Sequence, residues 1–578
     1  MDILFVDTFK QSSFYYFPLG INLLSSIVNT TSHYTSEAIS FPNLVLKKKL
    51  PQNILLESDF GKIVNYILDK NPKIISFYTL GDSYYISLIV ARNIKKINKN
   101  IKIIFAGPQA SLCSLETLES FDFIDLIAIG EGEKNIINII DYFNNKEKIE
   151  NIKGICYKKS DNIVYNEPQT LIESLDDLPM IKLDDDNIPD VMSIESGRGC
   201  PYNCTFCCTK TFWRRNTRLK SIDRIIEEIK FYSTQYNIRE FDFTHDLFTA
   251  KKEHVLKLCN KLIDLGIDIE WTCSARIDRI DVDMAKSMKK AGCKRVHLGI
   301  ETGSQRMQKK INKNLDMSKV RDKIKIINRC VPVQVNIIYG FPEEGEKDLF
   351  QSMDLVKFCV EKTLMERIAM SKCKCYPGTH IYFKNKDNLT LNKKNFNLFN
   401  YPSKNHINFI ESYPHLFSSL YIINDKLLDK YFYLDTFIRY MYTFLAIKLP
   451  RTMNEIITCY NDNLLDFYLE YQEEIQRIDR LLTKTIYYED KVNHVRKEML
   501  YGLEAFIKYK IENEFMIQLL QFEVEIMKVS LDRDSYVSKV ITFDYDMLTY
   551  YKESKKKKEE CKVTFASDGD EIDICRVM

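Results

Sequence analysis

Short apolar segments alternate with helical patterns through residues 1–385 of the chain. In the first part, these apolar segments lie at residues 3–7, 74–80, 101–108 and 125–133. Buried strands that alternate with helices form parallel, doubly wound sheets, and such sheets bind ligands at the carboxyl ends of their strands. The pattern therefore predicts an α/β fold that begins with a Rossmann-like domain.

A second series of strand and helix patterns follows a connecting segment. We interpret residues 151–190 as a hairpin and an acidic, proline-containing linker, with a domain boundary near residue 185. Repeated strand–helix units without a leading hairpin then fit a full or partial (β/α) barrel, which we assign to residues 191–385. The strand candidates of this barrel lie at residues 192–196, 239–245, 269–275, 295–302, 331–340 and 366–375.

The pattern changes again after the predicted barrel. Residues 386–420 are rich in Asn, Lys and Tyr and are expected to form a loop-rich connection. Residues 421–530 have helical periodicity, which predicts a mostly helical domain. Together with a terminal strand pair, this domain is expected to occupy residues 421–578, and residues 1–150 form the first domain.

Charge and hydropathy exclude several classes of protein. Lys and Arg number 82 against 80 Asp and Glu, a net charge of +2, whereas proteins that neutralise nucleic-acid phosphates usually have a basic excess. The N-terminus lacks the basic region of a signal peptide. Asp435 and Arg439 interrupt the most apolar late stretch, while a membrane helix needs ~20 apolar residues. We therefore expect a cytoplasmic protein with no membrane or nucleic-acid partner.

Three cysteines occur with a C-x3-C-x2-C spacing directly after the first barrel strand candidate: Cys200, Cys204 and Cys207. Three thiolates on one short loop can hold three irons of a [4Fe-4S] cluster and leave the fourth iron open, whereas four-iron clusters are normally bound by four cysteines. The alternative is a zinc site completed by Cys208. We favour the cluster, because structural zinc usually combines two separated cysteine pairs.

This loop, with Phe206 before its third cysteine, resembles the cluster loop of the radical S-adenosylmethionine (SAM) superfamily. The resemblance implies that the open iron binds the amino and carboxylate groups of SAM. An electron from a donor such as flavodoxin or ferredoxin then cleaves the sulfonium and produces a 5′-deoxyadenosyl radical. The cofactors supply this chemistry, and the barrel provides a dry cavity for the radical.

Further motifs of the superfamily imply contacts to SAM. The segment GIETGS contributes Glu301 and Ser304, TCSARID contributes Arg276, and FDFTHDLFT contributes Asp246. Phe206 completes this set of expected SAM-binding residues. His245 stands where relatives often have an acid. No catalytic side chain is predicted, and we interpret Cys373 and Cys375 as barrel core, with a role facing the cavity as the alternative.

The first 150 residues resemble the cobalamin (B12)-binding domain that precedes many radical SAM cores. The chain has no D-x-H-x-x-G motif after the first strand, and Gln109 stands where His is common. The resemblance therefore implies a cobalamin bound without a histidine ligand to cobalt. The residues that it assigns to cobalamin are Pro18, Leu19, Gly20, Tyr78, Thr79, Gly107, Pro108, Gly130, Glu131 and Gly132.

These resemblances together imply a cobalamin-dependent radical SAM enzyme, with methylation of an unactivated carbon as the leading hypothesis. In the family mechanism, the adenosyl radical removes a hydrogen atom from the substrate, and the carbon radical takes a methyl group from methylcobalamin. One alternative is a radical SAM cyclase, ring-rearranging or peptide-modifying enzyme without methyl transfer. Another is a non-catalytic, metal-stabilised binding protein. The substrate, a small molecule or peptide, is not predicted.

Overall fold

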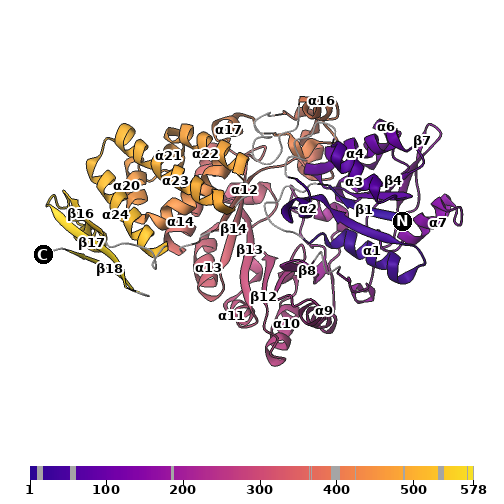
Figure 1. Cartoon of the computed structure of the whole chain (residues 1–578), viewed down its shortest axis with the longest axis horizontal. Coiled ribbons are helices and arrows are strands. Elements are labelled where there is room, and N and C mark those ends of the chain that lie inside the picture. The colour runs from indigo at the N-terminus through magenta and orange to yellow at the C-terminus, as the bar shows by residue number, and fades with distance from the viewer. Residues whose placement is uncertain are drawn as a thin grey trace.

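The computed structural model describes residues 1–8, 17–51, 60–183, 188–363, 365, 367–391, 404–423, 425–485, 489–531, 539–568 and 571–576. Its main bodies follow the order of the sequence (Figure 1). The N-terminal sheet with its helices is followed by a second parallel sheet, then by a bundle of helices and a small terminal sheet. None of the described helices is long and apolar enough to cross a bilayer.

The first sheet has seven strands in the order β2-β1-β3-β4-β5-β6-β7. The first five strands are parallel, as the alternating pattern predicts, and their neighbours β6 and β7 form an antiparallel hairpin at the edge. The predicted hairpin thus extends the N-terminal sheet. The bounds are β1 Ile3–Asp7, β2 Ser36–Ser40, β3 Ile74–Tyr78, β4 Lys102–Ala106, β5 Leu126–Ala128, β6 Ile155–Lys159 and β7 Asn162–Tyr165.

Side chains that alternate along β1 enter two different cores. Ile3 and Phe5 pack with one group of helices, and Leu4 and Val6 pack with another. This alternation is expected of a strand covered on both faces. The first face is covered by α1 (Leu19–Thr31) and α7 (Ile136–Phe143), and the second by α2 (Phe41–Leu46), α3 (Gly61–Asp69) and α4 (Tyr84–Ile97).

The second sheet has six parallel strands in the order β15-β14-β13-β12-β11-β8. Helices connect successive strands and cover the outer face, which gives the partial barrel that the sequence predicts. The strands are β8 Val191–Glu195, β11 Glu240–Thr244, β12 Glu270–Ala275, β13 Cys293–Glu301, β14 Val333–Tyr339 and β15 Ile368–Lys372. The main covering helices are α9 Ile222–Gln235, α10 Lys252–Asp264, α11 Val282–Lys290, α13 Met317–Cys330 and α14 Glu346–Thr363.

Shorter elements line the ends of these two sheets. They are α5 Pro108–Leu112, α6 Ser114–Ser120, β9 Gly197–Arg198, α8 Thr209–Trp213, β10 Arg218–Leu219, α12 Gln305–Lys310 and α15 His380–Asn385. The strands β9 and β10 pair with each other in antiparallel fashion, just before and just after the cysteine loop.

The C-terminal part is mostly helical. Its helices are α16 Lys404–Ser412, α17 Asp425–Lys430, α18 Leu434–Thr436, α19 Thr443–Lys448, α20 Pro450–Cys459, α21 Leu464–Glu470, α22 Gln472–Thr485, α23 Glu489–Phe506, α24 Glu514–Leu531 and α25 Met547–Glu553, with π-helical segments at Phe437–Tyr442 and Ile507–Ile511. The end of the chain forms a three-stranded antiparallel sheet instead of the expected strand pair. Its strands are β16 Lys539–Phe543, β17 Cys561–Asp568 and β18 Glu571–Arg576.

Candidate functional site

The cysteine loop begins beyond the carboxyl end of β8 and packs against two later parts of the barrel. Thr205 donates its backbone N–H to the Ile311 carbonyl at 3.0 Å, and the Ile381 N–H donates to the Thr205 carbonyl at 3.1 Å. Cys200, Cys204 and Cys207 are all partly exposed. Neighbouring segments therefore hold the backbone of the loop and leave its cysteines partly accessible.

The arrangement of the thiols bears on the choice between zinc and a cluster. Within the described ranges, no three His, Cys, Asp or Glu side chains are gathered in a group that could hold a metal ion. A zinc ion draws four ligands to about 2.3 Å of one centre, whereas a [4Fe-4S] cluster distributes its cysteines over separate irons. The assignment of the loop to a cluster rests on its cysteine spacing and stays a prediction.

Gly199, immediately before Cys200, is required by the backbone. Its φ is +90°, and a Cβ atom added there would lie 1.8 Å from the carbonyl oxygen of Asn216. Any residue with a Cβ atom would clash with this carbonyl oxygen. Only a glycine therefore allows the loop backbone to lie this close to residue 216. The direction in which the chain enters the cysteine loop follows from this contact.

Two side chains beyond the end of β11 bind the same glycine. The Gly199 N–H donates to Asp246 Oδ2 at 2.8 Å, and His245 Nε2 lies 3.1 Å from the Gly199 carbonyl oxygen. Burial lowers the pKa of His245 to about 4, so the ring is neutral near pH 7 and donates Nε2–H to this carbonyl. An ionised carboxylate at this position could not donate this hydrogen bond.

Asp246, predicted to contact SAM, is thus part of the support of the loop in this structure. Its second oxygen accepts a hydrogen bond from Thr209 Oγ1 at 3.3 Å, and its side chain remains exposed. A carboxylate with these two donors still has lone pairs available for a ligand amino group. Its predicted contact to SAM stays a prediction.

Arg276 and Glu301, also predicted to contact SAM, meet at Lys313. Lys313 Nζ lies 2.8 Å from Glu301 Oε1, and the Lys313 carbonyl accepts from Arg276 Nη2 at 2.8 Å. Arg276 also donates to Asp278 and lies 3.8 Å from the ring centre of Tyr202, in the cysteine loop. Lys313 lies outside the motifs of the sequence analysis, and Tyr202 is one of the unassigned positions of the cysteine loop, so only their contacts identify them.

This basic group lies close to the thiols. Burial raises the pKa of the Cys204 thiol, and the positive charges of Lys313 and Arg276 oppose this shift. Positive charge favours a thiolate, the form that binds iron. Glu301 itself has a φ of +70° at an irregularity in the pairing of β13 with β14. Such an unusual backbone conformation is often found at functional sites.

The structure places two of the predicted SAM residues in packing roles. Ser304 is fully buried, caps α12 by accepting from the Met307 N–H at 3.2 Å, and donates to Asp348 Oδ1 at 2.6 Å. Phe206 packs near Phe341, with ring centres 5.8 Å apart. Ser304 thus uses its hydroxyl proton and one lone pair on protein partners, and the predicted SAM contacts of Ser304 and Phe206 stay predictions.

Four residues predicted to bind cobalamin come together where β3 and β4 end. A Cβ atom on Gly107, whose φ is +92°, would lie 2.9 Å from the Tyr78 ring and 3.0 Å from the Thr79 backbone. Thr79 accepts from the Ala110 N–H at 2.9 Å, and Pro108 begins α5. These contacts produce a closely packed turn at the edge of the sheet where ligands bind in doubly wound folds.

Glu131 connects the N-terminal domain to the barrel. It is buried and forms ion pairs with Arg198 and Arg218, on either side of the cysteine loop. Gly130 and Gly132 flank it in the turn after β5. The structure thus gives Glu131 protein partners in the barrel, and its expected contact to cobalamin stays a prediction.

Gln109 stands where His is common in the cobalamin-domain pattern. It is buried, and its Nε2 donates to the Leu416 carbonyl at 2.8 Å. This bond joins the N-terminal domain to the segment that follows α16. The position is therefore used for contact with the C-terminal part of the chain.

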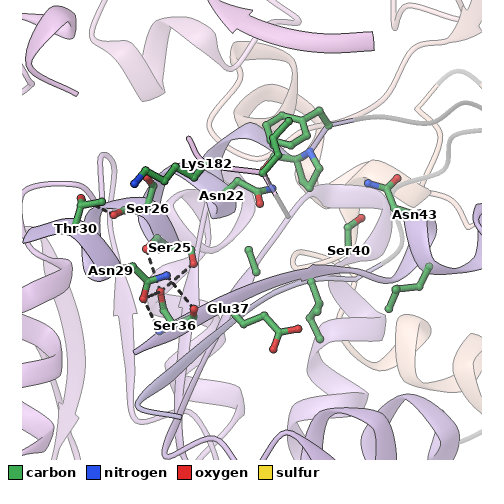
Figure 2. Close-up of a pocket in the computed structure, with 16 residues that line it drawn as sticks. Asn22, Ser25, Ser26, Asn29, Thr30, Ser36, Glu37, Ser40, Asn43 and Lys182 are labelled. Atoms are coloured by element: carbon green, nitrogen blue, oxygen red, sulfur yellow. Dashed lines mark hydrogen bonds between the residues drawn. The ribbon is translucent and has the colours of Figure 1, made fainter. Parts of the chain in front are cut away.

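A polar pocket of about 310 Å³ lies between α1 and the edge strand β2 (Figure 2). Pro18 lines it, next to Leu19 and Gly20 at the start of α1, while the other predicted cobalamin residues do not. Ser25, Ser36 and Asn29 hydrogen-bond to one another across it. Its lining consists of Phe17, Pro18, Asn22, Ser25, Ser26, Asn29, Thr30, Ser36, Glu37, Ala38, Ile39, Ser40, Asn43, Leu44, Lys182 and Leu183.

The segment after β15 connects the barrel with the N-terminal domain. Cys373 and Cys375 are buried in an apolar cluster with Phe341, which agrees with their interpretation as core. Lys374, between them, forms an ion pair with Asp82, in the turn after β3. The two domains therefore meet where the strands of both sheets end.

Comparison with known proteins agrees with the cysteine loop and the barrel. Residues 194–356 match the model of the Radical SAM superfamily. Residues 194–356 are thus a radical SAM domain. The matched residues extend from β8 into α14 and include the three cysteines of the loop.

Full-length relatives extend the similarity beyond this domain. An uncharacterized methyltransferase of Pyrococcus horikoshii is 27% identical over 374 residues, which cover 63% of this chain and 77% of that protein. An anaerobic magnesium-protoporphyrin IX monomethyl ester cyclase of Cereibacter sphaeroides is 22% identical, over half of each chain.

Solved structures share the fold over most of the length. The cobalamin-dependent SAM radical enzyme OxsB, solved with aqua-cobalamin bound, matches with a TM-score of 0.61 at 14% identity, over 91% of this chain and 84% of OxsB. The radical SAM methyltransferase TsrM from Kitasatospora setae matches with a TM-score of 0.53 at 12% identity, over 67% of this chain and 76% of TsrM. The radical SAM fold of this chain is thus combined with an N-terminal sheet and a helical C-terminal part, as in OxsB.

Proposed function

We propose that this chain is a cobalamin-dependent radical SAM enzyme that methylates an unactivated carbon atom. The observation that carries the proposal is the position of the three-cysteine loop: it lies at the carboxyl end of β8, in a parallel barrel that meets the strand ends of a doubly wound domain. A substrate between these two edges would be accessible from both cofactor sites. The relatives named as methyltransferases support the same reaction.

The residues of the loop fit a [4Fe-4S] cluster, and we assign Cys200, Cys204 and Cys207 to it. When bound, the cluster, SAM and cobalamin supply reductive cleavage of the sulfonium and a transferable methyl group. His245 and Asp246 hold the backbone of Gly199, directly before the first of these cysteines, and so would support the loop that holds the cluster.

The protein residues around the loop orient SAM and exclude water. Asp246 offers carboxylate lone pairs to an amino group, and Arg276 offers positive charge to a carboxylate. The Glu301–Lys313 pair closes the barrel side of the same space. The turn formed by Tyr78, Thr79, Gly107 and Pro108 is our proposed contact surface for cobalamin, without a histidine ligand.

An enzyme of this kind also needs a reductant and a substrate. We propose a flavodoxin or ferredoxin as electron donor, because both deliver single electrons at low potential. The cluster thiols must remain reduced, which fits the cytoplasm as the compartment. A radical cyclase without methyl transfer is the second candidate, favoured by the similarity to the magnesium-protoporphyrin ester cyclase over half the chain.

The test is anaerobic purification of the full chain with cobalamin supplied during expression. We expect about four irons and four sulfides per chain, bound cobalt, and formation of 5′-deoxyadenosine from SAM with a chemical reductant. Absence of iron after anaerobic reconstitution would refute the proposal. A Cys459→Ser variant serves as control, because Cys459 is an exposed cysteine far from the loop in sequence.

Methyl transfer is tested separately with SAM labelled in its methyl group. Label in a product formed from a cell extract of the source organism supports methylation. Formation of 5′-deoxyadenosine with an altered substrate but no label in the product would favour the cyclase or another rearrangement.

A further inference from the structure

A buried network of charges joins the N-terminal domain to the cysteine loop. Arg198, two residues before Cys200, donates to Glu131 Oε1 at 2.6 Å, to Glu133 Oε1 at 2.6 Å and to both oxygens of Glu195. Four hydrogen bonds from its guanidinium group thus reach three carboxylates. Glu131 and Glu133 lie in the turn after β5, whereas Glu195 ends β8 of the barrel.

Glu131 is the centre of this network. Besides Arg198, its Oε2 accepts from Arg218 Nη1 at 3.0 Å and from the Ile172 N–H at 2.7 Å. Its Oε1 also lies 2.9 Å from Arg218 Nη2 in an ion pair. The side chain is 2% exposed. Arg198 and Arg218 belong to the paired strands β9 and β10, which form the base of the cysteine loop. One carboxylate of the N-terminal domain therefore holds both ends of the loop.

The connection from Glu131 to the first cysteine is short and rigid. Arg198 is followed by Gly199, which the contact with Asn216 restrains, and then by Cys200. His245 and Asp246 hold Gly199 from the barrel side. The start of the loop is therefore fixed from the barrel on one side and from the N-terminal domain on the other.

The charges favour this arrangement only while the domains are in contact. Burial alone would raise the pKa of Glu131, but the hydrogen bonds from Arg218 and the charge of Arg198 lower it. Without Glu131, two buried guanidinium groups would face each other beside Trp213, whose ring centre lies 5.8 and 5.5 Å from them. Arg198 would keep Glu133 and Glu195 as partners, but Arg218 would lose the carboxylate with which it pairs. A buried charge left without its partner is strongly unfavourable.

We infer that Glu131 is a positioning residue for the cluster and not a cobalamin contact: it aligns Arg198 and Arg218, so that the cysteine loop has its cluster-binding geometry only while the N-terminal domain is docked. This inference rests on the proposed function. It makes the cluster site dependent on a domain that contributes no ligand to it.

The first experiment measures the network in the chain before cluster loading. Trp213 and Trp271 are the two tryptophans of the sequence, and Trp271 is buried in the barrel with its Nε1 bonded to the Ala291 carbonyl. A Glu131→Ala variant should shift the fluorescence of Trp213, because the cations beside its ring move. The same comparison in a Trp213→Phe background gives the part of the signal that comes from Trp271. Unchanged Trp213 fluorescence would overturn the inference.

The second experiment measures iron and cobalamin separately in the reconstituted holoenzyme. We expect Glu131→Ala to lower cluster affinity by about tenfold, as changes to residues that support metal ligands do, and to alter the electron paramagnetic resonance signal of the reduced cluster. Cobalamin affinity should remain within about twofold, well below the tenfold that 1.4 kcal/mol represents. Glu131→Gln keeps the shape and one acceptor oxygen and should retain more iron than Glu131→Ala.

The matched control is Glu167→Gln, which removes an exposed carboxylate paired with Lys153 at 2.9 Å. It should leave both iron and cobalamin unchanged. Loss of cobalamin with normal iron in Glu131→Ala would overturn the inference and support a direct cobalamin contact. Absence of iron from the wild-type chain would instead refute the proposed function, so the two failures are distinguishable.

Discussion

His245 predicts a measurable dependence of barrel stability on pH. Its folded-state pKa is about 4 because of burial, against about 6.5 for an exposed histidine. Between these values the unfolded chain binds a proton that the folded chain does not, so folding stability falls as the pH falls from 6.5 to 4. The full shift corresponds to about 3.4 kcal/mol, at 1.36 kcal/mol per pKa unit.

At pH 5 most of this loss is already present. The unfolded imidazole is then almost fully protonated and the folded one almost fully neutral, so the wild-type chain should lose about 2 kcal/mol relative to pH 7 through His245 alone. A His245→Gln variant keeps an N–H donor for the Gly199 carbonyl and has no titrating group. The change in stability from pH 7 to pH 5 should therefore be about 2 kcal/mol smaller in the variant.

The assay is urea unfolding followed by tryptophan fluorescence, since both tryptophans lie in the barrel part of the chain. Carboxylates titrate equally in both proteins, so the difference between them isolates His245. His254→Gln is the matched control: this histidine is only half-buried and bonds the Lys220 carbonyl at 2.8 Å. Equal pH dependence of wild type and His245→Gln would refute the assignment of His245 as a buried neutral donor.

Three further predictions concern the loop and its surroundings. Cys208→Ser should keep full iron content, whereas the same change at any of the three predicted ligands should abolish it; iron loss in Cys208→Ser would favour a four-thiolate site. Gly199→Ala should prevent cluster loading, because its Cβ would overlap the Asn216 carbonyl at 1.8 Å, and normal iron content would show that the loop can rearrange. Ser304→Ala should lower the free energy of unfolding in urea by about 1–3 kcal/mol, because the cap of α12 and the hydrogen bond to Asp348 are lost. Loss of SAM binding at unchanged stability would instead support its predicted SAM contact.

Much of the fold could be predicted because local patterns and tertiary structure agree. Four of the five parallel strands in the first sheet and all six in the second fall within or next to the predicted apolar segments. The missed strand is Ser36–Ser40, whose sequence SEAIS contains only two apolar residues. It lies at the edge of its sheet beside a polar pocket, and edge strands need fewer apolar side chains than central ones. The terminal sheet has three strands where a strand pair is predicted, because β16 also pairs with β17 across the intervening helix α25.

The sequence by itself determined which chemistry is available, namely three thiols on one loop directly after a strand. It could do so because the spacing of the cysteines is local and the loop supplies its own ligands. Only the tertiary structure decided what the surrounding polar residues do. Glu131 lies 67 residues from Arg198 in sequence, and His245 lies 46 residues from Gly199. A sequence shows that a carboxylate or an imidazole is present, but it does not show whether that group contacts a ligand or a buried arginine. Its role depends on the group that folding places next to it.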